Sequence, residues 1–186
     1  MSAFQPALNL QLPLQNELVA LKPLQEEDFE ALYRVASDPL IWEQHPNKNR
    51  YQKEIFRNFF NGAMESGGAY LILDRQTNEI AGSTRMYDLD TEQAKICIGY
   101  TFLARKFWGK GHNSAAKALL LSHAFGYVAE VHFHVGAENL RSQIAISRIG
   151  AKKIAEMEVA YYGEPSRLNF IYRIRRDEWQ QRNEKM

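Results

Sequence analysis

Apolar residues recur at two different spacings along the first third of the chain. Over residues 8–24 they lie close together, which predicts one or two strands, the second over residues 17–22. From residue 25 an acidic turn precedes apolar residues three to four positions apart, and this predicts an amphipathic helix ending near residues 37–39. The same spacing predicts a second helix over residues 51–66, which Gly67 and Gly68 end.

The period then shortens to that of strands. Residues 69–74, 79–87 and 94–103 are strand candidates, and polar turns at residues 75–78 and 88–91 separate them. This pattern predicts an antiparallel meander.

A helical segment follows the meander. Residues 113–127 are apolar nearly all round, so we expect this helix to be buried against a sheet. A short strand over residues 131–135 comes next, and the order strand, helix, strand predicts parallel pairing with residues 94–103.

The last part of the chain predicts four elements. A helix over residues 140–149 ends at Gly150, which suits a left-handed cap. Strands over residues 151–161 and 168–174 flank a turn, and a helix over residues 177–185 follows.

The turn between the third meander strand and the apolar helix is basic and glycine-spaced. Gly109 and Gly111 allow close approach of the backbone, and the free N–H groups of a helix N-terminus attract a phosphate. Arg105, Lys106 and Lys110 add positive charge. The spacing differs from the nucleoside-triphosphate and dinucleotide loops. A solvated basic turn without a ligand is the alternative.

Composition limits the kind of protein. With 186 residues, 45% hydrophobic content and no internal repeat or low-complexity linker, we expect one domain over residues 1–186. A net charge of +1 argues against nucleic acid as the main ligand. Cys97 is the one cysteine, no apolar stretch is long enough to cross a membrane, and no signal pattern begins the chain. We therefore expect a cytoplasmic location.

Residues 106–111, Lys-Phe-Trp-Gly-Lys-Gly, resemble the acyl-CoA motif Q/R-x-x-G-x-G/A of the GNAT acetyltransferases. The Trp-Gly-x-Gly form looks like the branch that includes the ribosomal-protein N-terminal acetyltransferases. Lys106 departs from the usual Gln or Arg and lacks the planar fork of arginine. The order of predicted elements is also that of the family. The resemblance implies an α/β fold with a mixed central sheet, splayed at the acyl-CoA site and flanked by helices.

The resemblance also implies acetyl-CoA as cosubstrate and direct acetyl transfer to a primary amine, either a protein N-terminus or a small molecule. Strand backbone would hold the pantetheine arm, and the glycine turn and the following N–H groups would hold the pyrophosphate. The cofactor-binding residues implied are Thr101, Phe102, Leu103, Lys106, Gly109, Lys110, Gly111, His112, Asn113, Ser114 and Asn139.

The segment Asn139-Leu140-Arg141-Ser142 matches a second family motif, N-x-x-A/S. By resemblance Ser142 is the candidate acid that protonates the departing thiolate. Asn139 is also explained as a helix cap alone. Many relatives carry Glu at the position of Cys97 and others carry Tyr at that of Ile146, so the general base is not assigned.

The remaining candidates are weaker. Trp42, Glu43 and His45 lie in a loop that in this family helps to form the acceptor side, although a surface loop anchored by one tryptophan explains them too. Arg85 and Tyr87 are further acceptor candidates. His132 and His134 alternate on one strand, but without a third ligand we expect a structural role and no metal site. Trp108 is expected to pack at the turn.

Two other classes of function stay open. The missing Glu and Tyr would fit an acyl-CoA-binding module without catalysis, and the fold could also serve an interaction protein by packing alone. The partners implied are acetyl-CoA and an amine, with neither nucleic acid nor membrane, and a homodimer is left open.

Overall fold

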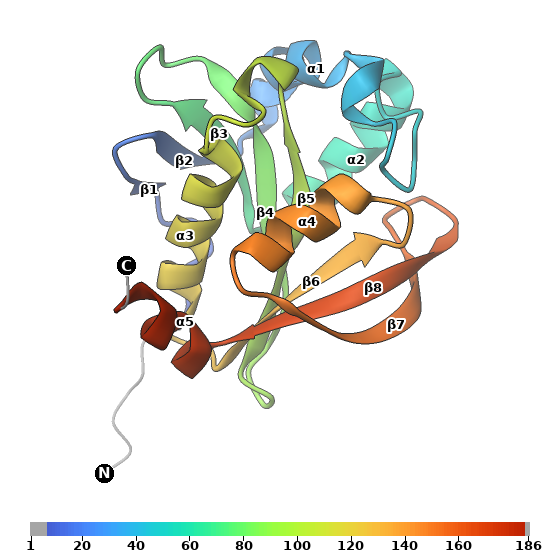
Figure 1. The fold of residues 1–186 in the computed structure, drawn as a ribbon. Helices are drawn as coiled ribbons and strands as arrows, with labels where there is room; N and C mark the ends of the chain where they lie inside the picture. The colour runs from blue at the N-terminus through green and yellow to red at the C-terminus, as the bar shows by residue number, and fades with distance from the viewer. Residues whose placement is uncertain (1–6, 185–186) are drawn as a thin grey trace.

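A single mixed sheet runs through the molecule (Figure 1), in a computed structural model that describes residues 7–184. Its strands are β1 (Leu14–Gln15), β2 (Val19–Pro23), β3 (Ala69–Asp74), β4 (Ile80–Asp90), β5 (Lys95–Leu103), β6 (Glu130–Gly136), β7 (Lys152–Ala160) and β8 (Ser166–Arg175). They lie in the order β1-β2-β3-β4-β5-β6-β8-β7. β5 and β6 are parallel, and the other paired neighbours are antiparallel, so the predicted meander and the predicted parallel pair are confirmed.

Helices cover both faces of the sheet (Figure 1). α1 (Phe29–Ala36) and α2 (Lys53–Ser66) lie on one face, and α3 (His112–Ala124) and α4 (Leu140–Arg148) lie on the other. α5 (Arg176–Asn183) finishes beside the C-terminal end of α3, where the rings of Phe125 and Trp179 are 6.4 Å apart. Three short 3₁₀ helices, Glu26–Asp28, Pro39–Ile41 and Arg105–Phe107, lie in the connections. The predicted α/β class with flanking helices is therefore confirmed.

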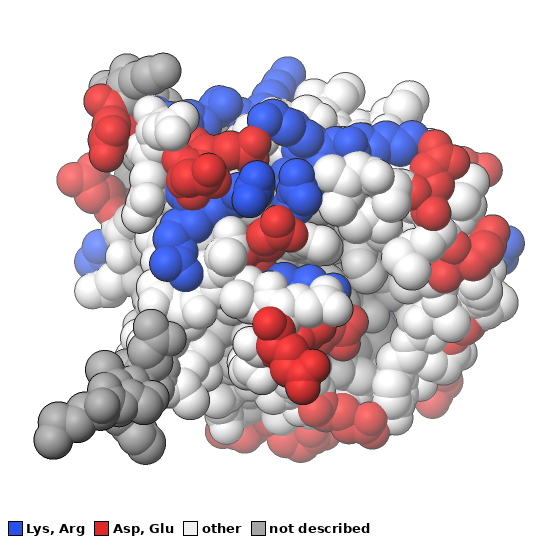
Figure 2. Space-filling model, turned by 90° about the horizontal axis from the view of Figure 1, so that it is seen from below, with Lys and Arg blue, Asp and Glu red and all other residues white. Residues whose placement is uncertain are grey.

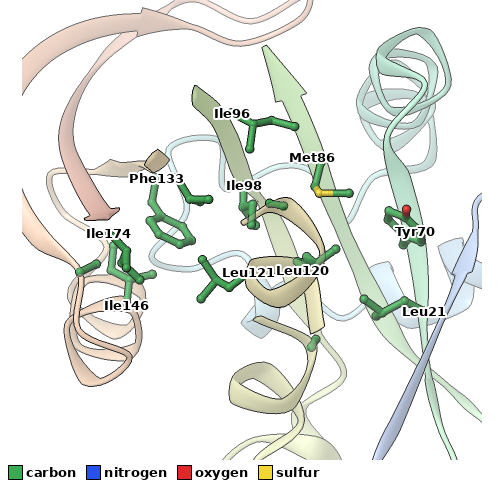
Figure 3. Close-up of a cluster of buried hydrophobic side chains, with 14 of the residues drawn as sticks. Leu21, Tyr70, Met86, Ile96, Ile98, Leu120, Leu121, Phe133, Ile146 and Ile174 are labelled. Carbon is green, nitrogen blue, oxygen red and sulfur yellow. The ribbon is translucent and has the colours of Figure 1, made fainter. Parts of the chain in front are cut away.

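The helix α3 joins the two halves of the sheet through one apolar core (Figure 3). Leu120 and Leu121 are fully buried and pack in the cluster that contains Ile98 of β5 and Phe133 of β6. Ile146 of α4 belongs to the same cluster. Each such leucine contributes about 1.5–3 kcal/mol by leaving water. The nearly all-apolar sequence of α3 is explained by this position.

Aromatic side chains fill the opposite face, between α1, α2 and the sheet. Trp42 is fully buried, and its Nε1 donates to the carbonyl of Ala36 at 2.7 Å. Its ring centroid lies 4.9 Å from that of Phe102 on β5. The connection between α1 and α2 is therefore tied to the strand that precedes the glycine turn.

β5 and β6 separate after a short stretch of pairing. Their register couples Lys95 with Glu130, Ile96 with Val131 and Cys97 with His132, and it goes no further. β5 continues to Leu103 and β6 continues to Gly136, where β6 pairs with β8. The predicted splay of the sheet is confirmed, and the second half of β5 is left with one open edge.

Several predicted boundaries were wrong. Residues 88–90 of the turn predicted at residues 88–91 belong to β4, because Asp90 pairs with Lys95 across a bulge; the chain turns at residues 91–94. The apolar helix ends at Ala124 rather than residue 127, since Gly126 and Tyr127 bond back to carbonyls three residues earlier. The last helix ends at Asn183, and residue 185 of the prediction lies outside the described residues. Gly150 has φ +98°, as its capping position predicted.

The charges of the chain nearly balance, with a formal net charge of +1. On the face shown in Figure 2, Lys and Arg lie mainly in the upper half, with some Asp and Glu among them, and Asp and Glu alone follow the lower edge. None of the helices within residues 7–184 has the length and apolar character to cross a membrane. An anion site on this protein must therefore be local.

Candidate active site

A cavity of about 750 Å³ opens where β5 and β6 separate. Its walls come from the second half of β5, the glycine turn with the start of α3, the end of β6, and α4. The connection that holds Gln44, His45 and Arg50 closes one side.

The glycine turn forms one end of this cavity. Gly109 has φ +72° and Gly111 has φ +85°, a region that other residues adopt only with strain. α3 begins at His112, so the N–H groups of its first turn lack helical partners and carry partial positive charge. Gly109, Gly111, His112, Asn113 and Ser114 all line the cavity. Five of the predicted cofactor residues thus come together where an anion would be held.

The lysines of the turn lie elsewhere. Lys106 and Lys110 are absent from the cavity wall, and Lys106 Nζ lies 2.7 Å from Glu79 Oε1 on the outer side of the turn. Two arginines of α4, Arg141 and Arg148, line the cavity instead. The guanidinium carbon of Arg141 lies 4.1 Å from the Trp108 ring centroid. Sequence reasoning missed both arginines, although each stands on the helix that follows the predicted cap.

The backbone of β5 is irregular where it borders the cavity. A bulge lies between the pairs Ser83–Phe102 and Arg85–Gly99, and inside it Tyr100 has φ +52°. Thr101, Phe102 and Leu103 follow and line the cavity as predicted. Because β6 has moved away, this edge is free to pair with a ligand.

A buried hydrogen-bonded pair supports the start of α3. His112 Nε2 lies 2.8 Å from Asp74 Oδ1, and both side chains are nearly inaccessible. The hydrogen bond from His112, with two more from Thr77, holds the pKa of Asp74 near 2. His112 Nδ1 has no partner among the described residues. The pair fixes the first residue of the helix whose N–H groups face the cavity.

The second motif begins α4. The Asn139 side chain accepts the N–H of Ser142 at 3.1 Å, so the predicted cap is confirmed. Ser142 lines the cavity with Asn139 and with the second half of β5. Ile146 lies one turn further along and is buried in the same wall.

Lys117 is the least expected residue of the wall. Its side chain is 3% exposed, and Nζ donates to Thr84 Oγ1 at 3.2 Å and to Thr101 Oγ1. No carboxylate among residues 7–184 pairs with it. Burial alone lowers the pKa of Lys117 from 10.5 to about 7. The amine therefore titrates near neutral pH beside the strand that borders the cavity.

Lys117→Met is expected to raise the melting temperature at pH 6 and to bring little gain at pH 10. The unfolded lysine keeps its proton up to pH 10.5 and the folded one loses it near pH 7. Unfolding therefore takes up a proton between these values, and stability rises with pH across this window. Below pH 7 the full cost of burying the cation is present. The melting temperatures of the wild type and Lys117→Met, measured from pH 6 to 10, test this, with the exposed Lys48→Met as control. A difference in melting temperature that stays the same at every pH would contradict it.

The proton-accepting groups of the cavity are not carboxylates. No Asp or Glu is found among the described residues of its wall. Cys97 is not in the cavity wall, and its Sγ lies 3.7 Å from Nε2 of His134, which is; burial raises the pKa of this thiol to about 12, so it stays protonated. Burial lowers the pKa of His134 below 6.5, which keeps this ring neutral at pH 7. His134 was expected to be structural, but it stands on the cavity wall where the strands separate.

Some of the acceptor-side candidates line the cavity and others do not. His45 lines the cavity, and desolvation with Arg50 and Arg141 nearby lowers its pKa well below 6.5. Trp42 is buried in the core and Glu43 lies outside the wall. Tyr87 lines the cavity. No group of three or more possible metal ligands occurs within residues 7–184.

An open mixed sheet that splays beside a glycine turn and a helix N-terminus defines the class of protein. Residues 19–152 match the family described as an acetyltransferase (GNAT) domain, which is more than half of the chain. The chain belongs to the GNAT acetyltransferase family, and its named relatives are acetyltransferases.

Individual relatives agree with this assignment. N-acetyltransferase p20 of Bacillus licheniformis, which is described as uncharacterized, is 28% identical over 117 residues, covering 60% of this chain and 65% of that protein. The match therefore spans less than two thirds of that relative. A T. thermophilus structure named as an acetyltransferase is 27% identical, with a TM-score of 0.76 over 93% of this chain and 94% of that one. A Vibrio cholerae structure described as a ribosomal-protein-serine acetyltransferase shares the fold at 15% identity, with a TM-score of 0.70 over 90% and 99% of the two chains.

Proposed function

We propose that this protein is an acetyl-CoA-dependent N-acetyltransferase that transfers the acetyl group directly to a primary amine. The observation that carries the proposal is the continuity of one cavity. Its wall combines N–H groups suited to a pyrophosphate, the open edge of β5, Ser142 and the separating strands. A molecule that carries a phosphate and a thioester would use each of these groups.

The chain's residues would have separate roles in the transfer. The backbone of Thr101, Phe102 and Leu103 would pair with the pantetheine arm, and the first turn of α3 would hold the pyrophosphate. As the new C–N bond forms and the C–S bond breaks, Ser142 would give its proton to the departing sulfur. The proton released by the amine would pass to water or to the neutral imidazole of His134, and Ser142 would take back a proton from water.

Ser142→Ala is expected to slow turnover about ten- to a hundredfold and to leave the Kd for acetyl-CoA nearly unchanged, because a general acid acts only as the bond breaks. Thiol release measures turnover and calorimetry measures the Kd. Ser147→Ala, an exposed serine on the same helix and outside the cavity wall, is the control. Unchanged turnover in Ser142→Ala would remove this residue from the acid role.

A second candidate is a non-catalytic acyl-CoA-binding module, and the absence of Asp and Glu from the described cavity wall favours it. Titration with acetyl-CoA followed by thiol-release assays on peptides, polyamines and amino acids separates the two. Binding with turnover supports the transferase, and binding without turnover on any amine supports the module. No binding at all would contradict both.

A further inference from the structure

A second cavity, of about 500 Å³, adjoins the first on the side of α2 and β7. The two cavities share Tyr87, Tyr100 and His134 in their walls. An acceptor that occupies the second cavity therefore reaches the point where β5 and β6 separate. Its volume suits a small molecule.

Arg85 lies in the wall of this second cavity with most of its hydrogen-bonding capacity unused. The residue is 4% exposed and stands on β4 opposite Gly99. Nη2 donates to the carbonyl of Phe59 at 3.2 Å, and buried Nε has no partner among the described residues. The guanidinium carbon lies 3.9 Å from the centroid of the Tyr100 ring. A guanidinium has five N–H donors, so the ring and one carbonyl leave it incompletely satisfied.

Arg50, the other buried arginine, has a carboxylate partner within the chain. Arg50 is 3% exposed, and Glu164 accepts two hydrogen bonds from it, at 2.9 and 2.8 Å. No carboxylate within residues 7–184 forms such a pair with Arg85. Burying a cation without an anionic partner is unfavourable, and a ligand anion would remove this cost.

The acidic residues around the second cavity do not pair with Arg85. Glu65 and Glu158 are exposed and accept hydrogen bonds from the hydroxyls of Tyr162 and Ser166. Asp88 is exposed as well. Burial lowers the pKa of Arg85 to about 10, so it remains a cation at neutral pH. The deepest charge in the cavity is therefore positive.

We propose that the second cavity binds an amine acceptor that also carries a carboxylate, an amino acid rather than a polyamine or a protein N-terminus, and that Arg85 binds this carboxylate. The inference rests on the proposed function. The planar fork of arginine matches a carboxylate through two parallel hydrogen bonds. A polyamine would bring further positive charge toward Arg85.

The wild-type enzyme alone tests the class of acceptor. Thiol release from acetyl-CoA is measured with α- and ω-amino acids, with the amide of each, and with diamines of equal length. For the amino acid that is acetylated fastest, we expect kcat/KM to be at least tenfold higher than for the amide of the same amino acid. Equal values for acid and amide, or a preference for diamines, would overturn the inference while leaving the transferase intact. Absence of turnover with every amine would contradict the proposed function instead.

Variants then test the residue. Arg85→Met is expected to raise KM for the amino acid at least tenfold and to leave the amide within about threefold, since only the acid loses a partner. Arg85→Lys keeps the charge but lacks the planar fork, so its KM for the amino acid should lie between those of the wild type and Arg85→Met. Arg57→Met is the matched control. The guanidinium carbon of Arg57 also lies over an aromatic ring, 3.1 Å from the Phe29 centroid, but the residue is outside both cavities. An unchanged acid-to-amide ratio in Arg85→Met would exclude Arg85 as the carboxylate site.

A binding measurement separates recognition from turnover. In the presence of CoA, the N-acetylated amino acid should raise the melting temperature of the wild type more than its amide does. This difference should disappear in Arg85→Met and persist in Arg57→Met. An equal shift by acid and amide in the wild type would contradict the assignment.

Discussion

Gly109→Leu is expected to weaken CoA binding about a hundredfold or more, which corresponds to roughly 3 kcal/mol. Gly109 lines the end of the cavity formed by the α3 N-terminus, and its φ is +72°. A Cβ built there meets no protein atom within 4 Å, so a side chain has room only in the space around the turn. Leucine must then either occupy the ligand's volume or turn the backbone and move the N–H groups. Calorimetric titration with CoA measures the effect.

Gly67→Leu is the matched control for backbone strain. Gly67 has φ +63°, and a Cβ there also meets nothing within 4 Å, but it caps α2 away from the cavity wall. Each variant should lose about 1–3 kcal/mol of stability from the strained backbone. CoA affinity should fall in Gly109→Leu alone. Equal loss in both variants would attribute the effect to strain and remove the turn from the binding site.

Local patterns account for the elements that were predicted well. β3 was predicted with its observed bounds because residues 69–74 lie between a glycine stop and a polar turn. The position of β8 between β6 and β7 had no such signal, since it depends on pairing of residues 169–175 with residues 130–136. The boundary of β4 was missed because Asp88 has φ +53° within a bulge, which continues the strand where composition indicates a turn.

Some parts of the site could be predicted from the sequence and others could not. The glycine turn and the Asn139 cap are each a continuous stretch of sequence, and both line the same cavity as Ser142. Arg85 was an acceptor candidate by resemblance, but its lack of a carboxylate partner depends on tertiary contacts, and periodicity carries no information about those. Lys117 has a local signal in the sequence, because a lysine interrupts the apolar pattern of α3 between Ala116 and Leu120. A charged residue on the buried side of a helix indicates a specific environment.

Arg50→Met is expected to lower the free energy of unfolding by roughly 3–5 kcal/mol, because it leaves Glu164 buried without its partner. The two side chains are 3% and 6% exposed and are joined by two hydrogen bonds. The Arg50 guanidinium also lies 4.8 Å from the centroid of the Phe59 ring. The pair connects the segment before α2 with the turn between β7 and β8, so its loss should loosen one side of the cavity. Urea denaturation measures the change.

The double variant Arg50→Met/Glu164→Leu distinguishes an orphaned charge from lost packing. If the cost of Arg50→Met comes from the unpaired Glu164, removing both charges should restore most of the stability. Lys53→Met is the control, because the Lys53–Glu30 pair is as close, at 2.7 Å, but 49% and 61% exposed. An exposed pair contributes about 0–1 kcal/mol, so this variant should unfold near the wild-type urea midpoint. A double variant no more stable than Arg50→Met would instead assign the role of Arg50 to its contacts with the aromatic rings, since removing the charge on Glu164 would then bring no relief.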